Sequence, residues 1–229
     1  MGLSHSPSLA TNGLLLAVDA ANPRSYPGSG TTWNDLSGNA HNGTLTNGPT
    51  YSSGNGGHIV HTGASNHHTA IANTTALRLT TSVTLQAMIY PTSYPSGGGG
   101  GGFIVAMPGA YYLELKNSGV LRTYFYGLSN AGYHDGTNTV PLNQWSHVSV
   151  VRDQSANTIV TYINGVVDRT ISSITGSMTT AVNTLQIGAF SGGGYSFNGR
   201  IANAHVYNRA LSATEILQNF TAMRGRFGL

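Results

Sequence analysis

Cysteine is absent from this sequence of 229 residues, and charged residues make up only 7% of it. The first absence excludes disulfides, so burial of apolar area must stabilise the fold. The second sets the chain apart from ordinary soluble domains, which are about 25% charged. Ser, Thr, Asn and the 31 glycines must therefore cover the surface. Such a surface suits a protein that packs against neighbouring molecules.

Clusters of positive charge and long apolar runs are missing as well. Ten Lys and Arg residues stand against seven acidic residues, a formal charge of +3, and they are scattered along the chain. Nucleic-acid binding requires clustered cations that neutralise several phosphates. A membrane span requires roughly 18 apolar residues in succession. We therefore expect neither nucleic acid nor a membrane among the partners.

The N-terminal sequence MGLSHSPSLAT lacks the cationic start and the apolar core of a secretory signal. We expect a product that is made in the cytoplasm and is not exported. A virion component that is released when the host cell lyses is one explanation for such a product.

The acidic residues do not form pairs along the sequence. Glycoside hydrolysis needs two carboxylates about 5 to 9.5 Å apart, yet no two acids lie two to four residues from each other. Acids on different strands are still able to pair in space. A cysteine nucleophile and a Gly-x-Ser-x-Gly elbow are also absent. We therefore expect no enzymatic activity.

Alternating polarity and frequent turn signals predict an all-β fold. Residues 83–90 alternate as a strand does, and residues 13–19 form a short apolar run suited to a strand buried on both faces. The six glycines of residues 97–102 indicate a flexible surface loop. Further strands are expected near residues 43–46, 58–63, 67–72, 76–79, 103–107, 185–190 and 201–208.

Residues 117–119, Asn-Ser-Gly, predict a three-residue hairpin loop with glycine at the left-handed position. The register that follows places Glu114 opposite Arg122 and Tyr112 opposite Tyr124. One side of this hairpin is then apolar, and the other carries polar and aromatic side chains.

A second hairpin and one helix complete the prediction. Asn164-Gly165 indicates a type I′ turn, and Ser212 with Glu215 forms a helix capping box. Apolar residues then share one helix face: Ile216, Leu217, Phe220 and Met223. Together these signals predict a two-sheet antiparallel jelly-roll sandwich with one short C-terminal helix, in which the N- and C-terminal strands pair.

Residues 144–215 carry a specific series of motifs: QWSHVSVVRD, TYINGVV, LQIG and FNGRIANAHVYNRALSATEI. The series resembles the laminin-G-like, concanavalin A-like jelly roll. The resemblance implies a single such domain over residues 13–229 after an N-terminal tail of residues 1–12. Because this fold carries lectins, glycosidases and adhesion modules alike, it identifies a scaffold and only constrains the function.

The two ends of the sequence, residues 1–51 and 198–229, resemble laminin-G-like proteins encoded among the structural genes of marine tailed phages, including cyanophages. This resemblance implies a virion structural protein of capsid decoration or fibre type. Its expected partners are other virion proteins, further copies of itself and host-surface glycans. A carbohydrate-binding lectin module is the first alternative, and a jelly-roll glycosidase is the second.

Sugar binding needs aromatic faces and a few polar groups. One sheet face or its rim offers both in this sequence. The alternative is that these side chains pack against a neighbouring subunit. The candidate carbohydrate-binding residues are Tyr112, Tyr124, Tyr126, Tyr133, His134 and Asp135.

Four histidines, His58, His61, His67 and His68, lie within eleven residues. Imidazole is a common metal ligand, but strand alternation points His58 and His61 to opposite faces. We therefore expect surface or edge histidines and no cofactor.

Calcium is what the resemblance suggests, yet His61-Thr62-Gly63 stands where relatives often carry Phe-Asp-Gly. Calcium prefers several oxygen ligands, so only a weak site is open as an alternative. The candidate metal ligands are Asp19, Asp35, His61 and His67.

Overall fold

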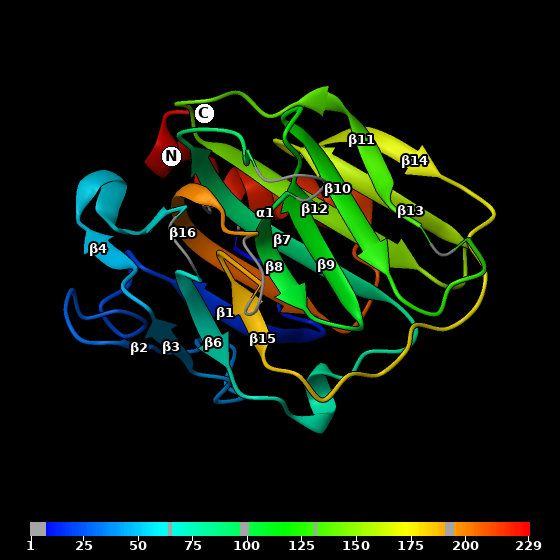
Figure 1. Cartoon of the computed structure of the whole chain (residues 1–229), viewed down its shortest axis with the longest axis horizontal. Helices are drawn as coiled ribbons and strands as arrows, with labels where there is room; N and C mark the ends of the chain where they lie inside the picture. The colour runs from blue at the N-terminus through cyan, green and yellow to red at the C-terminus, as the bar shows by residue number, and fades with distance from the viewer. Residues whose placement is uncertain (1–7, 64–65, 97–100, 131, 191–194) are drawn as a thin grey trace, which may run out of the picture.

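The computed structural model describes residues 8–63, 66–96, 101–130, 132–190 and 195–229 (Figure 1). Two antiparallel sheets of eight strands each pack face to face. Most of the glycine loop expected at residues 97–102 lies outside the described residues, and Gly102 begins a strand. The predicted all-β sandwich with one C-terminal α-helix is confirmed.

Sheet A has the strand order β14-β13-β12-β7-β16-β5-β4, and β1 pairs with β16 beside this series. The pairing of β1 with β16 confirms that the N- and C-terminal strands lie together. The strands of sheet A are β1 (Leu14–Asp19), β4 (Thr50–Ser52), β5 (His58–Thr62), β7 (Val83–Pro91), β12 (Ser146–Asp153), β13 (Thr158–Ile163), β14 (Val166–Ile171) and β16 (Asn198–Tyr207).

Sheet B has the order β11-β10-β9-β8-β15-β6-β3-β2. Its longest uninterrupted hairpin series runs from β8 to β11. The strands of sheet B are β2 (Thr32–Trp33), β3 (Gly43–Thr46), β6 (His68–Ile71), β8 (Gly102–Met107), β9 (Tyr111–Leu115), β10 (Val120–Phe125), β11 (His134–Thr139) and β15 (Leu185–Ile187).

Both predicted hairpins form with the expected register. Glu114 lies opposite Arg122, and Tyr112 lies opposite Tyr124 across β9 and β10. Gly119 has a φ of 81° in the connecting loop, a conformation that side chains with a Cβ rarely adopt. Asn164 and Gly165 both have positive φ, as a type I′ turn requires.

The main core lies between the two sheets. Leu113 and Leu121 from sheet B and Val148 from sheet A are fully buried in it. Trp33 is also fully buried and anchors the long loop region between β1 and β3. The inner face of each sheet is therefore buried in the core, and the other face of each sheet points away from it.

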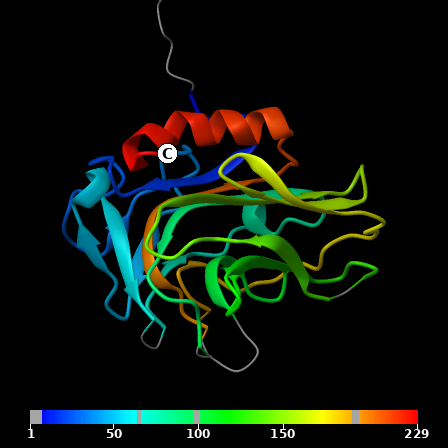
Figure 2. The ribbon, with the colours of Figure 1, turned by 90° about the horizontal axis from the view of Figure 1, so that it is seen from above.

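Helix α1 (Ala213–Arg224) covers the outer face of sheet A, as Figure 2 shows. The predicted capping box is present: the Ser212 hydroxyl accepts from the Glu215 backbone N–H, and the Glu215 side chain accepts from the Ser212 N–H. The expected buried face is wrong at Leu217, which is half exposed, whereas Asn219 is fully buried. Among the described residues, no helix has the length and apolar character of a membrane span.

Asn219 is buried because hydrogen bonds satisfy its amide. It donates to Gln86 Oε1 at 2.9 Å and to the Tyr207 hydroxyl at 3.0 Å, and it accepts from the Ala10 N–H at 2.8 Å. The segment 8–12, which was expected to be a tail, is thereby held against α1. The predicted domain boundary at residue 13 stays a prediction.

The strand expected at residues 76–79 is wrong. Thr75–Leu77 instead form a short 3-10 helix, η2. Leu77 is fully buried, and its carbonyl accepts a hydrogen bond of 2.8 Å from the Tyr111 hydroxyl. The remaining 3-10 helices are η1 (Gly54–Gly56) and η3 (Gly225–Phe227).

Two histidines lie under α1 on the outer face of sheet A. His147 is fully buried, and its ring stacks on Phe220 of the helix at 5.9 Å. Burial lowers the pKa of His147 to about 3 and that of His205 to about 4. Both rings are therefore neutral in the folded protein near neutral pH.

We expect acid to destabilise the fold through these two rings. Their pKa values are lowered on folding, so the unfolded chain binds more protons between about pH 6.5 and pH 4, and stability falls as the pH drops through that window. Replacement His147→Gln should reduce the loss of unfolding free energy between pH 7 and pH 5 by about 1 to 2 kcal/mol. Urea unfolding at the two pH values measures it.

The same substitution at half-buried His67 serves as the control. An equal pH dependence in wild type and His147→Gln would contradict the assignment of acid sensitivity to this ring.

Candidate functional site

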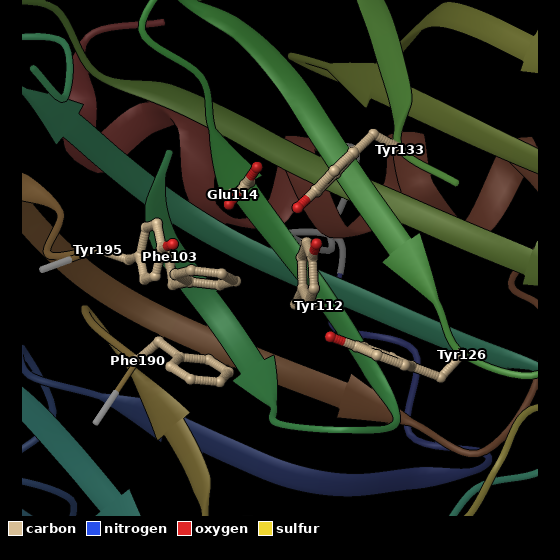
Figure 3. Close-up of a pocket in the computed structure, with 7 residues that line it drawn as sticks. All are labelled: Phe103, Tyr112, Glu114, Tyr126, Tyr133, Phe190 and Tyr195. Carbon is tan, nitrogen blue, oxygen red and sulfur yellow. The ribbon is translucent and has the colours of Figure 1, made fainter. Parts of the chain in front are cut away.

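In the part of the chain that the structure describes, no helix covers the outer face of sheet B (Figure 2). Aromatic side chains gather on this face (Figure 3). They surround a hollow of about 200 Å³. This volume is below the roughly 300 to 1,000 Å³ of pockets for drug-sized ligands, and it suits a single sugar ring. The lining residues are Phe103, Tyr112, Glu114, Tyr126, Tyr133, Phe190 and Tyr195.

The strand period of two places these side chains. On β9, Leu113 points into the core, so its neighbours Tyr112 and Glu114 point outward. Phe103 of β8 meets Tyr112 edge to face, with ring centroids 4.7 Å apart. Aromatic pairs at this distance stabilise each other by about 0.5 to 1.5 kcal/mol beyond their burial. The floor of the hollow is therefore rigid.

The rim of the hollow is more accessible than its floor. Tyr112 is only 4% exposed, whereas Tyr133 is 59% exposed and Tyr195 38%. Phe190 packs on Phe103 with ring centroids 5.2 Å apart and closes the side toward β15. A ligand would thus meet ring faces and hydroxyls around a buried aromatic floor.

Glu114 supplies the carboxylate of this lining. It is 1% exposed, and its Oε1 has no hydrogen-bond partner among the described residues. Burial raises the pKa of Glu114 to about 7, although Arg122 and the Gly101 N–H act in the opposite direction. The Glu114 carboxylate thus lines the hollow, and its Oε1 is buried, without a hydrogen bond from the described residues, 3.7 Å from the Arg122 Nε.

Arg122 joins Glu114 to a second acid. Its Nε lies 2.6 Å from Asp135 Oδ1 but 3.7 Å from Glu114 Oε1, so its stronger interaction is with Asp135. Lys116 also binds Asp135, at 2.8 Å. Burial raises the pKa of Asp135, but the hydrogen bonds from Arg122 and Lys116 outweigh this and leave it below its ordinary value. The Arg122 guanidinium also stacks 4.5 Å from the Tyr133 ring centroid.

Three of the six predicted sugar-binding residues line the hollow, one packs beside it, and two do not contribute to it. Tyr112, Tyr126 and Tyr133 line the hollow. Tyr124 packs on Tyr126, with centroids 4.4 Å apart, and supports the lining from behind. The other two do not line it: Asp135 binds Arg122, and His134 lies opposite the core-facing residue Thr123 and so points to the other side of the sheet.

Sequence reasoning missed four lining residues: Phe103, Glu114, Phe190 and Tyr195. The predicted hairpin register correctly placed Glu114 opposite Arg122. Because neighbouring residues of a strand point to opposite faces, the core position of Leu113 indicated that Glu114 and Tyr112 share the outward face. Phe190 and Tyr195 come from a distant part of the chain, and no local pattern connects them with β8 or β9.

Three of the four clustered histidines are buried, contrary to the expectation of surface or edge positions. His58, His61 and His68 are buried, and His67 is partly buried. His58 packs against Trp145 on the outer side of sheet A, whereas His61 points between the sheets, against Gly188. The predicted orientation of His58 and His61 toward opposite faces of the sheet is confirmed. Both side chains are buried because other elements cover both faces of sheet A.

Asp19 and Asp35, the acidic metal candidates, are engaged by protein groups. Asp19 accepts from Arg226 at 2.7 and 2.9 Å. Asp35 accepts from the backbone N–H groups of Ala17 and His41, among others, and so organises a loop. The described residues contain no group of three or more His, Asp or Glu side chains that could hold a metal ion.

A family model described as "Concanavalin A-like lectin/glucanases superfamily" matches residues 61–217. The match covers more than half of the sequence, so the chain belongs to this laminin-G-type family. No curated protein sequence matches it.

Three solved structures show the same fold. The binding domain of Paraclostridial Mosquitocidal Protein 1 is 16% identical, with a TM-score of 0.69; the match covers 92% of this chain and 52% of that one. Domain 4 of the arabinanase AbnA from Geobacillus stearothermophilus, in complex with arabinotriose, is 18% identical, with a TM-score of 0.67 and coverage of 90% and 97%. The binding domain of Botulinum Neurotoxin DC, in complex with SialylT, is 13% identical, with a TM-score of 0.70 and coverage of 93% and 52%. The chain thus spans about half the length of the two toxin chains.

The raised pKa of Glu114 predicts that this residue destabilises the protein at alkaline pH. A carboxyl whose pKa rises from 4.5 to about 7 on folding favours the folded state at low pH, and this contribution is lost as the pH rises through about 7. We expect Glu114→Gln to increase the free energy of unfolding by about 1 to 3 kcal/mol at pH 8 and by less at pH 5. Denaturant unfolding at both pH values measures it.

Glu215→Gln is the matched control with the opposite expected sign. The hydrogen bond from Arg209 lowers the pKa of Glu215 to about 2, so this replacement should destabilise the protein at pH 8. Destabilisation by Glu114→Gln at pH 8 would contradict the prediction.

Proposed function

We propose that this member of the concanavalin A-like lectin and glucanase superfamily is a carbohydrate-binding module, and that the hollow on the outer face of sheet B is its binding site. The observation that carries the proposal is the union, in one hollow, of six aromatic side chains with tyrosine hydroxyls and one carboxylate. Sugars offer C–H faces that pack on aromatic rings and hydroxyls that hydrogen-bond at their edges.

Domain 4 of AbnA supports this proposal, because it has the same fold over nearly its whole length and was solved with arabinotriose. The toxin binding domain in complex with SialylT supports it in the same way. At these identities the likeness concerns the fold, so the evidence for a site in this chain is its own aromatic hollow.

Binding without hydrolysis agrees better with the placement of the acids. Glu114 and Asp135 do approach each other in space, around Arg122. Asp135 does not line the hollow, however, and its carboxylate is engaged by Arg122 and Lys116. A hydrolase would need both carboxylates free to reach one glycosidic bond.

Replacement Tyr133→Ala tests the site with little risk to the fold, because Tyr133 is 59% exposed. We expect wild type to bind at least one class of glycan on an array and the variant to bind it roughly tenfold more weakly, a loss of about 1.4 kcal/mol. Titration calorimetry with the best array ligand measures the ratio.

Leu217→Ala is the control, since Leu217 is half exposed on α1 at the opposite side of the sandwich. Equal losses in both variants, or no glycan bound by wild type, would contradict the proposed site. Release of reducing sugar from the bound glycan would show a hydrolase instead.

The setting that we propose for this binding is the surface of a phage particle, as capsid decoration or as part of a fibre, with other virion proteins and further copies of the chain as partners. The resemblance of residues 1–51 and 198–229 to phage structural proteins supports it, as does a surface of low charge. The solved structures named above support the glycan-binding part alone.

Mass spectrometry of purified particles tests the setting. We expect peptides of this chain in high copy number, relative to the major capsid protein, in particles of the phage that encodes it. Purification through a density gradient separates incorporated protein from lysate contaminants. Absence of the chain from intact particles would overturn the virion role and would leave the carbohydrate-binding proposal unaffected.

A further inference from the structure

We infer that the hollow selects a sugar that carries a primary ammonium group, a hexosamine with a free amine; this inference rests on the proposed function. The lining joins a buried carboxylate to several aromatic ring faces, and both kinds of group attract a cation. A neutral sugar would use the rings and leave the charge of Glu114 without an opposite partner in the ligand.

The acceptor atom of Glu114 defines what the ligand must provide. Oε1 is buried and has no hydrogen-bond partner among the described residues, and a buried acceptor that stays unsatisfied costs about 1 to 3 kcal/mol. A ligand N–H or O–H placed there removes this cost. An ammonium N–H forms a charge-assisted bond, which is roughly twice as strong as a neutral one.

The rings around the carboxylate add to the preference. Tyr112 and Phe103 form the floor beside Glu114, Tyr133 lies near the carboxylate, and Tyr126 lies on the far side of Tyr112 (Figure 3). A cation over such ring faces gains about 0.5 to 2 kcal/mol, with the larger values in desolvated sites. A quaternary ammonium would gain this energy too, but it has no N–H to donate to Oε1, so a primary ammonium fits both features.

The nearby protein cations do not replace the ligand. The Arg122 Nε lies 3.7 Å from Glu114 Oε1, beyond hydrogen-bond distance, and its closer contact is with Asp135 at 2.6 Å. Lys116 binds Asp135 at 2.8 Å, and neither cation lines the hollow. The Arg122 guanidinium also stacks on the Tyr133 ring, 4.5 Å from its centroid. A sugar carboxylate would instead lie beside Glu114 and be repelled, so acidic sugars are disfavoured.

Three pairs of sugars test the inference: glucosamine against glucose, galactosamine against galactose, and mannosamine against mannose. The members of a pair differ only by an ammonium group in place of a hydroxyl. We expect the amino sugar of at least one pair to bind at least tenfold more tightly, about 1.4 kcal/mol, at a pH where its amine is protonated and Glu114 is ionised. NMR titration of the isotope-labelled full chain gives each Kd.

The variant Glu114→Gln keeps the shape of the side chain and removes its charge. It should bring the ratio within each pair close to one, while the affinity for the neutral sugar changes little. Asp153→Asn is the matched control, because it removes one negative charge at the end of β12 in sheet A. This control should keep the full preference for the amino sugar.

The outcomes separate this inference from the proposed function. Neutral sugars that bind as tightly as their amino partners would overturn the ammonium selectivity and leave the carbohydrate site in place. If the monosaccharides bind too weakly to measure, array glycans decide in the same way, and hits that lack a free amine overturn the selectivity. No binding of any sugar or array glycan would contradict both proposals.

Discussion

Two stacked sheets have two outer faces, and the described chain has one α-helix with which to cover them. Helix α1 lies on sheet A, so the outer face of sheet B must be compatible with water by itself. The rest of the structure follows from this division. On the covered side, His147 and Asn219 are buried among apolar and polar partners. On the uncovered side, the chain places tyrosines whose rings pack together, from the buried Tyr112 to Tyr133, which is 59% exposed.

The uncovered face carries one group that does not serve stability. Burial of Glu114 works against its charge. Sites that bind or react commonly retain such costly groups, because the ligand supplies the missing interaction. The buried carboxylate of Glu114 thus lowers the stability of the fold and, in the proposed site, raises its affinity for a ligand.

The sequence predicted those features that depend on neighbours along the chain. The β9–β10 register followed from a glycine at one turn position, and with it the outward pairing of Tyr112 with Tyr124. Features that depend on distant segments were not predictable in this way. Burial of His147 depends on Phe220, and closure of the hollow depends on Phe190 and Tyr195. Strand alternation gives the side to which a residue points but not what lies there.

The positions of the two ends of the described chain determine how the domain can be joined to other molecules. The described chain starts at Ser8, whose carbonyl accepts from Gln218 of α1, and it ends just after the same helix, at η3. Both ends therefore leave the sandwich on the side of α1, away from the hollow (Figure 2). A tether at either end, natural or engineered, would hold the domain by its back and present the aromatic face outward.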